Sequence, residues 1–301
     1  MKKIANFIKE KFTRKKAFSL IELSIVLLII GIIIAGVTNA SSLIRKYQLS
    51  TARQLTQNAP MNAMTGIMFW VETTAEESFD VDIENGSAIS TWRDLNATSN
   101  TKYNAVSSGS NRPTYTENCI KGLPCLSFDG VDDYIDNTVS ASLTSFTIFV
   151  ITKYTNPSVA SYILSSVGVS ESLNMVNDGY FYMYIRSDGM MQNQVGYAGN
   201  STVIGAVSQF IGLSFPYLLT FSERNGVTLS TRANKVEQTS AASTYGGTQN
   251  IRGVSIGSGP DHSYFFTGKI GEIIMFDRSL TTNERDSVEA YLVKKWNIKV
   301  N

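Results

Sequence analysis

Histidine and cysteine are scarce in this chain, whose 301 residues include one histidine, His262, and two cysteines, Cys119 and Cys125. A zinc site built from these residue types needs about four ligands, or three and a water molecule, so that class of site is excluded. A Ser-His-Asp triad would depend on His262, and no Gly-x-Ser-x-Gly motif supplies an activated serine. The sequence also lacks the paired-glutamate strand motif of related glycosidases. We therefore expect that the protein is not an enzyme.

An excess of basic charge is confined to one end of the chain. Seven of the 26 basic residues lie within residues 1–17, together with a single acidic residue, Glu10. The rest of the chain is mildly acidic and has no basic cluster of the kind that binds nucleic acid. A nucleic-acid partner is therefore not expected.

A long apolar run follows the basic segment. Residues 18–37, FSLIELSIVLLIIGIIIAGV, contain one charge, Glu22. Twenty helical residues extend roughly 30 Å, the hydrocarbon thickness of a bilayer, and the run is too long for a secretory signal peptide. The basic flank should stay cytoplasmic, so the rest of the chain would cross the membrane. A plain membrane anchor explains the length of the run but not its carboxylate, which is costly in an apolar span.

Residues 15–23, KKAFSLIEL, account for both features. They resemble the prepilin cleavage and methylation motif of type IV pilins and of the pseudopilins of type II secretion. The resemblance implies that residues 1–17 are a leader, that prepilin peptidase cuts between Ala17 and Phe18, and that Phe18 becomes the methylated N-terminus. The family usually has glycine before the cut, where this chain has the similarly small Ala17. In a filament, the positive N-terminus of one subunit could neutralise Glu22 of its neighbour.

This resemblance also implies a location and partners. Before assembly the chain would cross the inner membrane once, with its C-terminal domain in the periplasm. It would then enter a pilus or pseudopilus, or reach the cell surface. The expected partners are prepilin peptidase, the membrane, and other pilin or pseudopilin subunits.

The apolar run should continue as a longer helix. An amphipathic stripe from Val37 to Leu55 extends it, and Pro60 disfavours helix at Ala59. We expect one helix over residues 18–58, within a transmembrane and assembly segment covering 18–60. Its outer half could pack on its own head domain or on neighbouring subunits.

Short β-rich runs separated by turn residues dominate the sequence beyond residue 65. Strands are predicted at residues 146–152, 180–185, 217–221, 227–231 and 269–276, with turn dipeptides at 178–179, 188–189 and 225–226. Many short strands over about 230 residues predict a mainly β fold, a β-sandwich or jelly roll. A helix should close the chain, because Thr281 and Glu284 form a capping-box pattern before an apolar face of Val288, Tyr291, Leu292 and Trp296.

Three segments of the head resemble the concanavalin-A-like, laminin-G-like jelly roll. They are residues 89–94 (ISTWRD), 126–134 (LSFDGVDDY) and 268–280 (GKIGEIIMFDRSL), the last running into the closing helix. The resemblance implies such a domain over residues 65–301. Members of this class bind carbohydrate or protein, or serve as structural modules, so a glycan or a surface protein is an expected ligand.

Two clusters are candidate sites within the head. Cys119 and Cys125 are expected to form a disulfide, because an exported domain meets an oxidising environment and their spacing is not that of a C-x-x-C redox pair. The carboxylates Asp129, Asp132, Asp133 and Asp136 would suit calcium, which laminin-G-like domains sometimes bind. The alternative is a solvated hairpin turn in which aspartates make local hydrogen bonds. No other cofactor is expected.

Aromatic residues alternate along one predicted strand, where Tyr180, Tyr182 and Tyr184 flank Phe181. Cross-strand and core packing is the ordinary role of such residues, and stacking on sugar rings is the alternative for those that face outward.

Three functions remain open at this point. The favoured one is a minor pilin or pseudopilin that displays a lectin-like adhesion domain, because a head of about 230 residues is large for a repeating major subunit. The second is a membrane-anchored binding module that never polymerises. The third, least favoured, is an exported glycan-active enzyme.

Overall fold

The computed structural model describes residues 19–80, 83–155, 159–166, 180–197, 200–210, 215–224, 227–241 and 248–300, with backbone only at residues 35, 37–39, 41, 197, 200–210 and 239–241. The chain forms two compact units, Met1–Tyr47 and Gln48–Asn301. We call the second unit the head.

The elements in chain order are α1 (Leu20–Gln57), η1 (Pro60–Ala63), β1 (Ile67–Glu72), η2 (Glu76–Ser78), β2 (Thr91–Trp92), β3 (Ala105–Val106), η3 (Gly109–Asn111), β4 (Thr114–Ile120), β5 (Leu123–Asp129), β6 (Ile135–Asn137), β7 (Ala141–Leu143), β8 (Ser145–Tyr154), β9 (Ser161–Ser166), β10 (Tyr180–Ile185), β11 (Met190–Tyr197), β12 (Asn200–Phe210), β13 (Tyr217–Arg224), β14 (Thr228–Ala233), β15 (Val236–Ala241), β16 (Gln249–Ile251), β17 (Val254–Ile256), β18 (Thr267–Phe276) and α2 (Thr282–Trp296).

Helix α1 matches the helix predicted from the sequence. It covers 38 residues and ends at Gln57, and the chain is extended at Ala59 before the proline that opens η1. Apolar side chains along its first half are exposed, among them Leu27 at 60% and Ile32 at 64%. Taken over the described residues alone, no helix passes a test of length and hydropathy for crossing a membrane. The membrane span expected at residues 18–37 therefore stays a prediction from the sequence.

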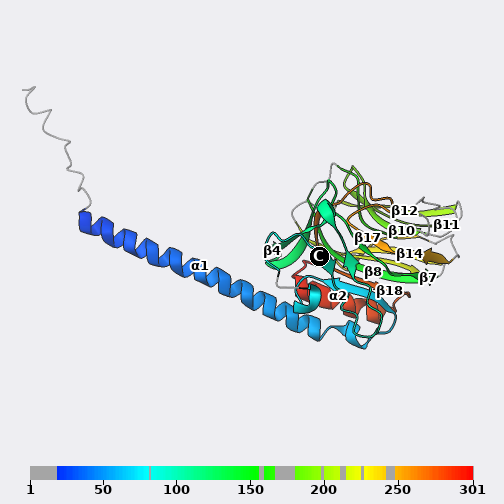
Figure 1. Ribbon diagram of the computed structural model, residues 1–301, viewed down its shortest axis with the longest axis horizontal. Coiled ribbons are helices and arrows are strands. Elements are labelled where there is room, and N and C mark those ends of the chain that lie inside the picture. Colours follow the sequence, from blue (N-terminus) through cyan, green and yellow to red (C-terminus); the bar gives the residue numbers. More distant parts are fainter. Residues whose placement is uncertain are drawn as a thin grey trace, which may run out of the picture. The chain divides into compact units, whose positions relative to one another are not determined.

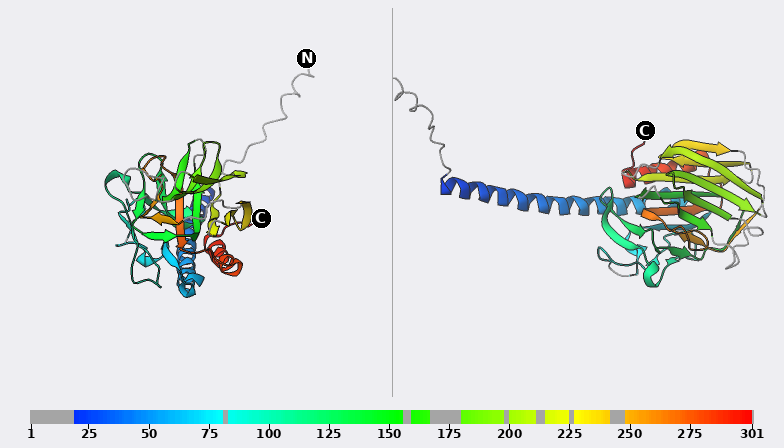
Figure 2. Two further views of the ribbon diagram at one scale, coloured as in Figure 1. Left: turned by 90° about the vertical axis from the view of Figure 1, so that its right-hand side faces the viewer. Right: turned by 90° about the horizontal axis from the view of Figure 1, so that it is seen from above.

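The head is a β-sandwich, as predicted, and its strands are seen from three directions in Figures 1 and 2. Sheet A has the strand order β15-β14-β13-β8-β18-β5-β4, and β1 also pairs with β18. Sheet B has the order β12-β11-β10-β9-β17-β6-β3-β2, and β16 pairs with β7 in a small third sheet. Strands β8 and β18 are neighbours although more than a hundred residues separate them, so the fold depends on long-range antiparallel pairing.

The main core lies between the two sheets. Alternate residues of β10, which are Phe181, Met183 and Ile185, face inward with Phe146 and Ile148 of β8. Burial of such side chains is the main favourable contribution to folding, at roughly 25 cal/mol per Å² of apolar surface.

A second core covers the other face of sheet A. Phe149 and Ile151, the alternate residues of β8, pack there with Leu292 and Trp296 of α2, and Figure 1 shows α2 lying beside β8 and β18. Because sheet A is buried on both faces, β8 is continuously buried from Phe146 to Thr152. Ala52, near the end of α1, is buried in the same core. Residues 48–57 of α1 therefore pack on the head of the same chain. The sequence analysis had left open whether this part of the helix packs there or on neighbouring subunits.

A buried ionic cluster joins the elements of this second core. Glu72 of β1 and Glu272 of β18 lie directly opposite each other in adjacent antiparallel strands. Two like charges in that position repel. Lys295 of α2 lies between them, with Nζ 3.1 Å from Glu72 Oε2 and 2.9 Å from Glu272 Oε2. We call Glu72, Glu272 and Lys295 the buried charge cluster.

The remaining oxygens of the cluster are satisfied by neutral donors. Glu272 accepts hydrogen bonds from the indole nitrogens of Trp70 (2.8 Å) and Trp296 (2.7 Å) and from the hydroxyl of Tyr291 (2.9 Å). Burial raises the pKa of Glu272, and the ammonium of Lys295 opposes that rise. A buried charge of this kind is tolerated only when it is fully paired, so each donor is needed to hold the fold.

The closing helix begins with the predicted capping box. Thr281 Oγ1 accepts a hydrogen bond from the backbone amide of Glu284, and Glu284 Oε2 accepts one from the amide of Thr281 at 2.9 Å. Arg278 also donates to both carboxylate oxygens of Glu284, at 2.9 and 2.7 Å. These bonds, led by that of Arg278, lower the pKa of Glu284 to about 2.

The variant Glu284→Gln should test this helix cap. It keeps the capping geometry but loses the ion pair, so we expect a loss of about 0.5–1 kcal/mol of unfolding free energy at pH 7. The folded pKa lies below the unfolded value, so the stabilisation is complete above about pH 4.5 and is lost as the pH falls towards about 2. Denaturation of the detergent-solubilised chain at several pH values measures this difference. Glu117→Gln, an exposed strand position, is the control, and a difference that stayed constant down to pH 2 would contradict the assignment.

Candidate functional site

The predicted processing residues, Ala17 and Phe18, lie outside the described residues. Glu22, the predicted assembly residue, lies in the first turn of α1 and is exposed. Its Oε2 accepts a hydrogen bond from the backbone amide of Ser19 at 2.8 Å, and Ser19 Oγ accepts one from the amide of Glu22 at 3.2 Å. Glu22 therefore caps its own helix in the single chain, a second role that the sequence analysis did not identify.

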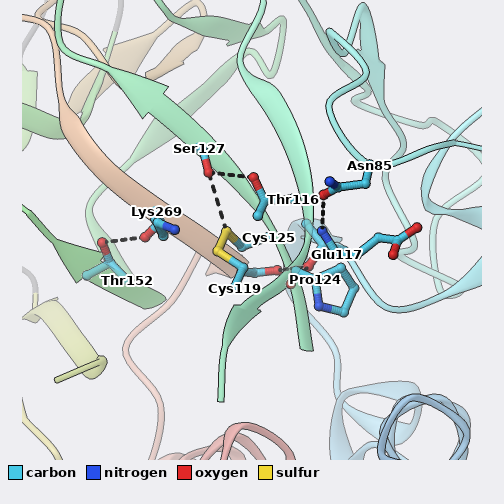
Figure 3. The surroundings of a disulfide bond; sticks show 11 residues. Asn85, Thr116, Glu117, Cys119, Pro124, Cys125, Ser127, Thr152 and Lys269 are labelled. Carbon is cyan, nitrogen blue, oxygen red and sulfur yellow. Dashed lines mark hydrogen bonds between the residues drawn. A yellow bond between two sulfur atoms is a disulfide. The ribbon is translucent and has the colours of Figure 1, made fainter. Parts of the chain in front are cut away.

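The predicted disulfide is present between Cys119 and Cys125, whose Cα atoms are 5.7 Å apart. Figure 3 shows it joining neighbouring strands β4 and β5, near a hydrogen bond of 2.9 Å between Thr116 and Ser127. The strands turn between them at Lys121 and Gly122, both at positive φ. The disulfide thus closes a tight hairpin, and the two cysteines are structural.

Three of the four predicted calcium ligands lie together at the end of β5 and in the turn that follows it. Carboxylate oxygens of Asp129, Asp132 and Asp133 are all within 4.8 Å of one another. Part of this acidic group is already used in the turn, because Asp129 Oδ1 accepts the amide of Val131 at 2.8 Å and Asp133 Oδ2 accepts the amide of Asp129 at 2.9 Å. Burial, with the charges of Asp129 and Asp132, raises the pKa of Asp133 to about 6. The free oxygens would fit one face of a cation, which would relieve this repulsion.

The fourth residue, Asp136, points elsewhere. It lies on β6, where its Oδ2 is 3.0 Å from Nε2 of His262. The imidazole also stacks on Tyr134, with ring centroids 3.9 Å apart. In the described part of the chain no serine hydroxyl bonds to His262, so the Asp-His pair is not joined by a nucleophile there.

Tyrosine rings gather on the outer face of sheet B. Tyr180, Tyr182 and Tyr184 are partly exposed, whereas Phe181 between them is buried in the core. Tyr162 of β9 lies against them, 4.7 Å from Tyr184 between ring centroids, and Tyr264 lies 6.2 Å from Tyr162. We call these five tyrosines the tyrosine face. The alternation along β10 revealed three of them, but Tyr162 and Tyr264 gave no signal, because strand pairing brings Tyr162 to the face and a loop distant in sequence brings Tyr264.

Two of the cavities in the described part of the head lie away from the tyrosine face. The larger, about 540 Å³, lies beside the end of α1 and is bordered by Arg53, Glu76 and Lys102. The smaller, about 360 Å³, is bordered by Lys121, Phe215 and Tyr217. Neither contains a residue that the sequence analysis proposed as a ligand.

Comparison with known proteins places a family motif at one end of the chain. Residues 12–38 match the prokaryotic N-terminal methylation motif, which is the motif expected at residues 15–23. The match includes Ala17, Phe18 and Glu22. No curated protein sequence matches the chain.

Solved structures resemble the head in fold. The binding domain of botulinum neurotoxin DC in complex with SialylT has a TM-score of 0.54 at 12% identity, over 77% of this chain and 52% of that one. A botulinum neurotoxin type C structure, from work on cell entry through two ganglioside molecules, has a TM-score of 0.54 at 13% identity, over 78% and 53%. A Trypanosoma rangeli sialidase has a TM-score of 0.47 at 15% identity, over 77% of this chain and 33% of that one, and this score is too low to show a shared fold. This chain spans about half the length of the two toxin structures. The likeness supports the jelly-roll fold predicted for the head.

Calcium binding at the acidic turn is open to a direct test. We expect calcium at about 1 mM, the upper end of the dissociation constants of weak extracellular sites, to raise the melting temperature of the chain. Asp132→Asn should abolish the rise, because it removes a carboxylate from the cluster. Asp136→Asn should leave it unchanged, because that side chain binds His262. A melting temperature insensitive to calcium would instead favour the hydrogen-bonded turn.

Proposed function

We propose that this chain is a minor pilin-like subunit of a type IV pilus or of a type II secretion pseudopilus, and that its head is a carbohydrate-binding adhesion domain. The observation that carries the proposal is the methylation motif over residues 12–38, with Glu22 in the first turn of a 38-residue helix. The chain would be cut after Ala17, cross the inner membrane once, and then join the filament.

The charge of Glu22 would act during assembly. In the single chain its carboxylate accepts a hydrogen bond from the backbone amide of Ser19, a neutral donor, and no salt bridge joins it to another described residue. A carboxylate in an apolar environment is stabilised most by a cation. The α-amino group freed at Phe18 of a neighbouring subunit would supply one. Correct stacking of subunits would then be favoured over free subunits by this ion pair.

Carbohydrate as the ligand is supported by the fold and by surface chemistry. The toxin structures of similar fold are described by their bound SialylT and by gangliosides. The tyrosine face offers partly exposed rings, on which sugars stack. We propose binding rather than catalysis, because no serine hydroxyl among the described residues bonds to His262, whose ring nitrogen Nε2 pairs with Asp136.

Substitutions at Glu22 test assembly. Glu22→Ala and Glu22→Gln should both reduce the amount of chain in sheared filaments by at least about tenfold, while leaving cleavage and membrane insertion intact. Glutamine keeps an acceptor for the Ser19 amide, so loss in both variants assigns the effect to charge rather than to the helix cap. Glu117→Ala on the head surface is the control.

Quantitative blotting of filament and membrane fractions measures the outcome. A chain that is absent from filaments even as the wild type would favour the membrane-anchored module that never polymerises. Wild-type incorporation by Glu22→Gln would refute the role of the charge.

A further inference from the structure

The tyrosine face is a continuous surface made by three separate parts of the chain. It combines Tyr162 of β9, the outward residues Tyr180, Tyr182 and Tyr184 of β10, and Tyr264 of the loop between β17 and β18. Rings of Tyr180 and Tyr182 are nearly parallel, at 12° with centroids 6.0 Å apart. The ring of Tyr162 stands almost perpendicular to that of Tyr182, at 86° and 5.2 Å. The surface therefore combines two parallel rings, those of Tyr180 and Tyr182, with the perpendicular ring of Tyr162.

Two glycines make room for these rings. A Cβ atom at Gly196 would lie 2.3 Å from Cζ of Tyr180, so any other residue would displace the ring. A Cβ at Gly259 would lie 3.1 Å from the ring of Tyr162. The tyrosines lie over the backbone of their neighbours, and the face depends on small residues beneath them.

Amide side chains fix the tyrosine hydroxyls. The hydroxyl of Tyr182 donates to Oε1 of Gln194, and Nε2 of Gln194 donates to the hydroxyl of Tyr180 at 2.7 Å. Gln192 Nε2 also lies 3.5 Å from the Tyr182 hydroxyl. Along β11, the edge of the face is thus a row of fixed hydrogen-bond donors and acceptors next to apolar rings. A sugar has matching features, because its ring has an apolar face and a rim of hydroxyl groups.

Charges around the face disfavour an acidic ligand. Arg186, which follows β10, is paired with Asp188 at 2.9 Å. Asp261 borders the loop side and, after burial and the neighbouring Tyr184, contributes to raising the pKa of Tyr162 to about 12. Asp136 lies on the same side with His262. A carboxylate on a ligand would meet these acids, whereas uncharged hydroxyl groups would not.

We propose that the tyrosine face is the binding site for a neutral oligosaccharide, whose pyranose rings stack on Tyr184, Tyr264 and their neighbours while its hydroxyl groups bond to Gln192. This inference rests on the proposed carbohydrate-binding function and names its site and ligand class. Sheet A is covered by the helices, so the outer face of sheet B is the broad sheet surface available to a ligand in the described part of the head.

The test uses the full-length chain in a zwitterionic detergent without a sugar headgroup. Neutral hexasaccharides of glucose, mannose, galactose and N-acetylglucosamine are titrated calorimetrically, with sialyllactose as the acidic probe. We expect at least one neutral probe to bind and sialyllactose to bind more weakly. Tyr184→Ala and Tyr264→Ala should each weaken binding about five- to tenfold, because each removes a stacking ring.

Two variants control this experiment. Tyr184→Phe keeps the ring and should bind within about twofold of the wild type, since stacking needs no hydroxyl. Phe215→Ala removes an aromatic side chain that is 55% exposed beside the smaller cavity and should leave binding unchanged. Tyr264 is 60% exposed, so its loss should not unfold the head, and melting curves check this for every variant.

The outcomes separate the inference from the proposed function. Wild-type affinity in both alanine variants, with glycan binding intact, overturns the tyrosine face and leaves the proposed function standing. Preference for sialyllactose overturns the assignment of a neutral ligand. Absence of binding to any probe by the wild-type chain overturns the inference together with the carbohydrate-binding part of the proposed function, and leaves filament assembly to its own test.

Discussion

The placement of one lysine between two opposed glutamates governs how this head is built. Glu72 and Glu272 face each other across β1 and β18, and without Lys295 the two strands would bring like charges together in a dry core. Lys295 belongs to the closing helix, so its two ion pairs link α2 to the central strands. Thr56 of α1 lies 3.5 Å from Glu72 and 3.4 Å from Tyr291, which brings the end of the long helix into the same network.

The two sheets of the head differ in which of their faces are covered. Sheet A is buried on both sides, because α2 and residues 48–57 of α1 cover the face that the second sheet does not. Sheet B keeps an open face and carries the tyrosines there. The tyrosine face is therefore distinct from the surface that receives the helix. Such a division suits a protein whose helix is held in a filament while its head meets a ligand.

Elements with local signals could be predicted from the sequence, whereas contacts between distant segments could not. The capping box of Thr281 and Glu284 acts over three residues, and the Cys119–Cys125 pair spans one hairpin. Both could therefore be predicted from the local sequence alone. Glu72 gave no signal, because a single acid in a strand ordinarily faces water. Of the four aspartates, Asp129, Asp132 and Asp133 lie close together, whereas Asp136 is on the following strand and pairs with His262, and calcium binding stays a prediction.

The account depends most on the claim that the chain is processed and assembled as a pilin-like subunit. Mass spectrometry of the N-terminal peptide, from protein isolated from its native cell, tests this directly. The account predicts a mature chain that begins at an N-methylated Phe18. Recovery of the full leader, with Met1 still attached in cells whose prepilin peptidase is active, would contradict it.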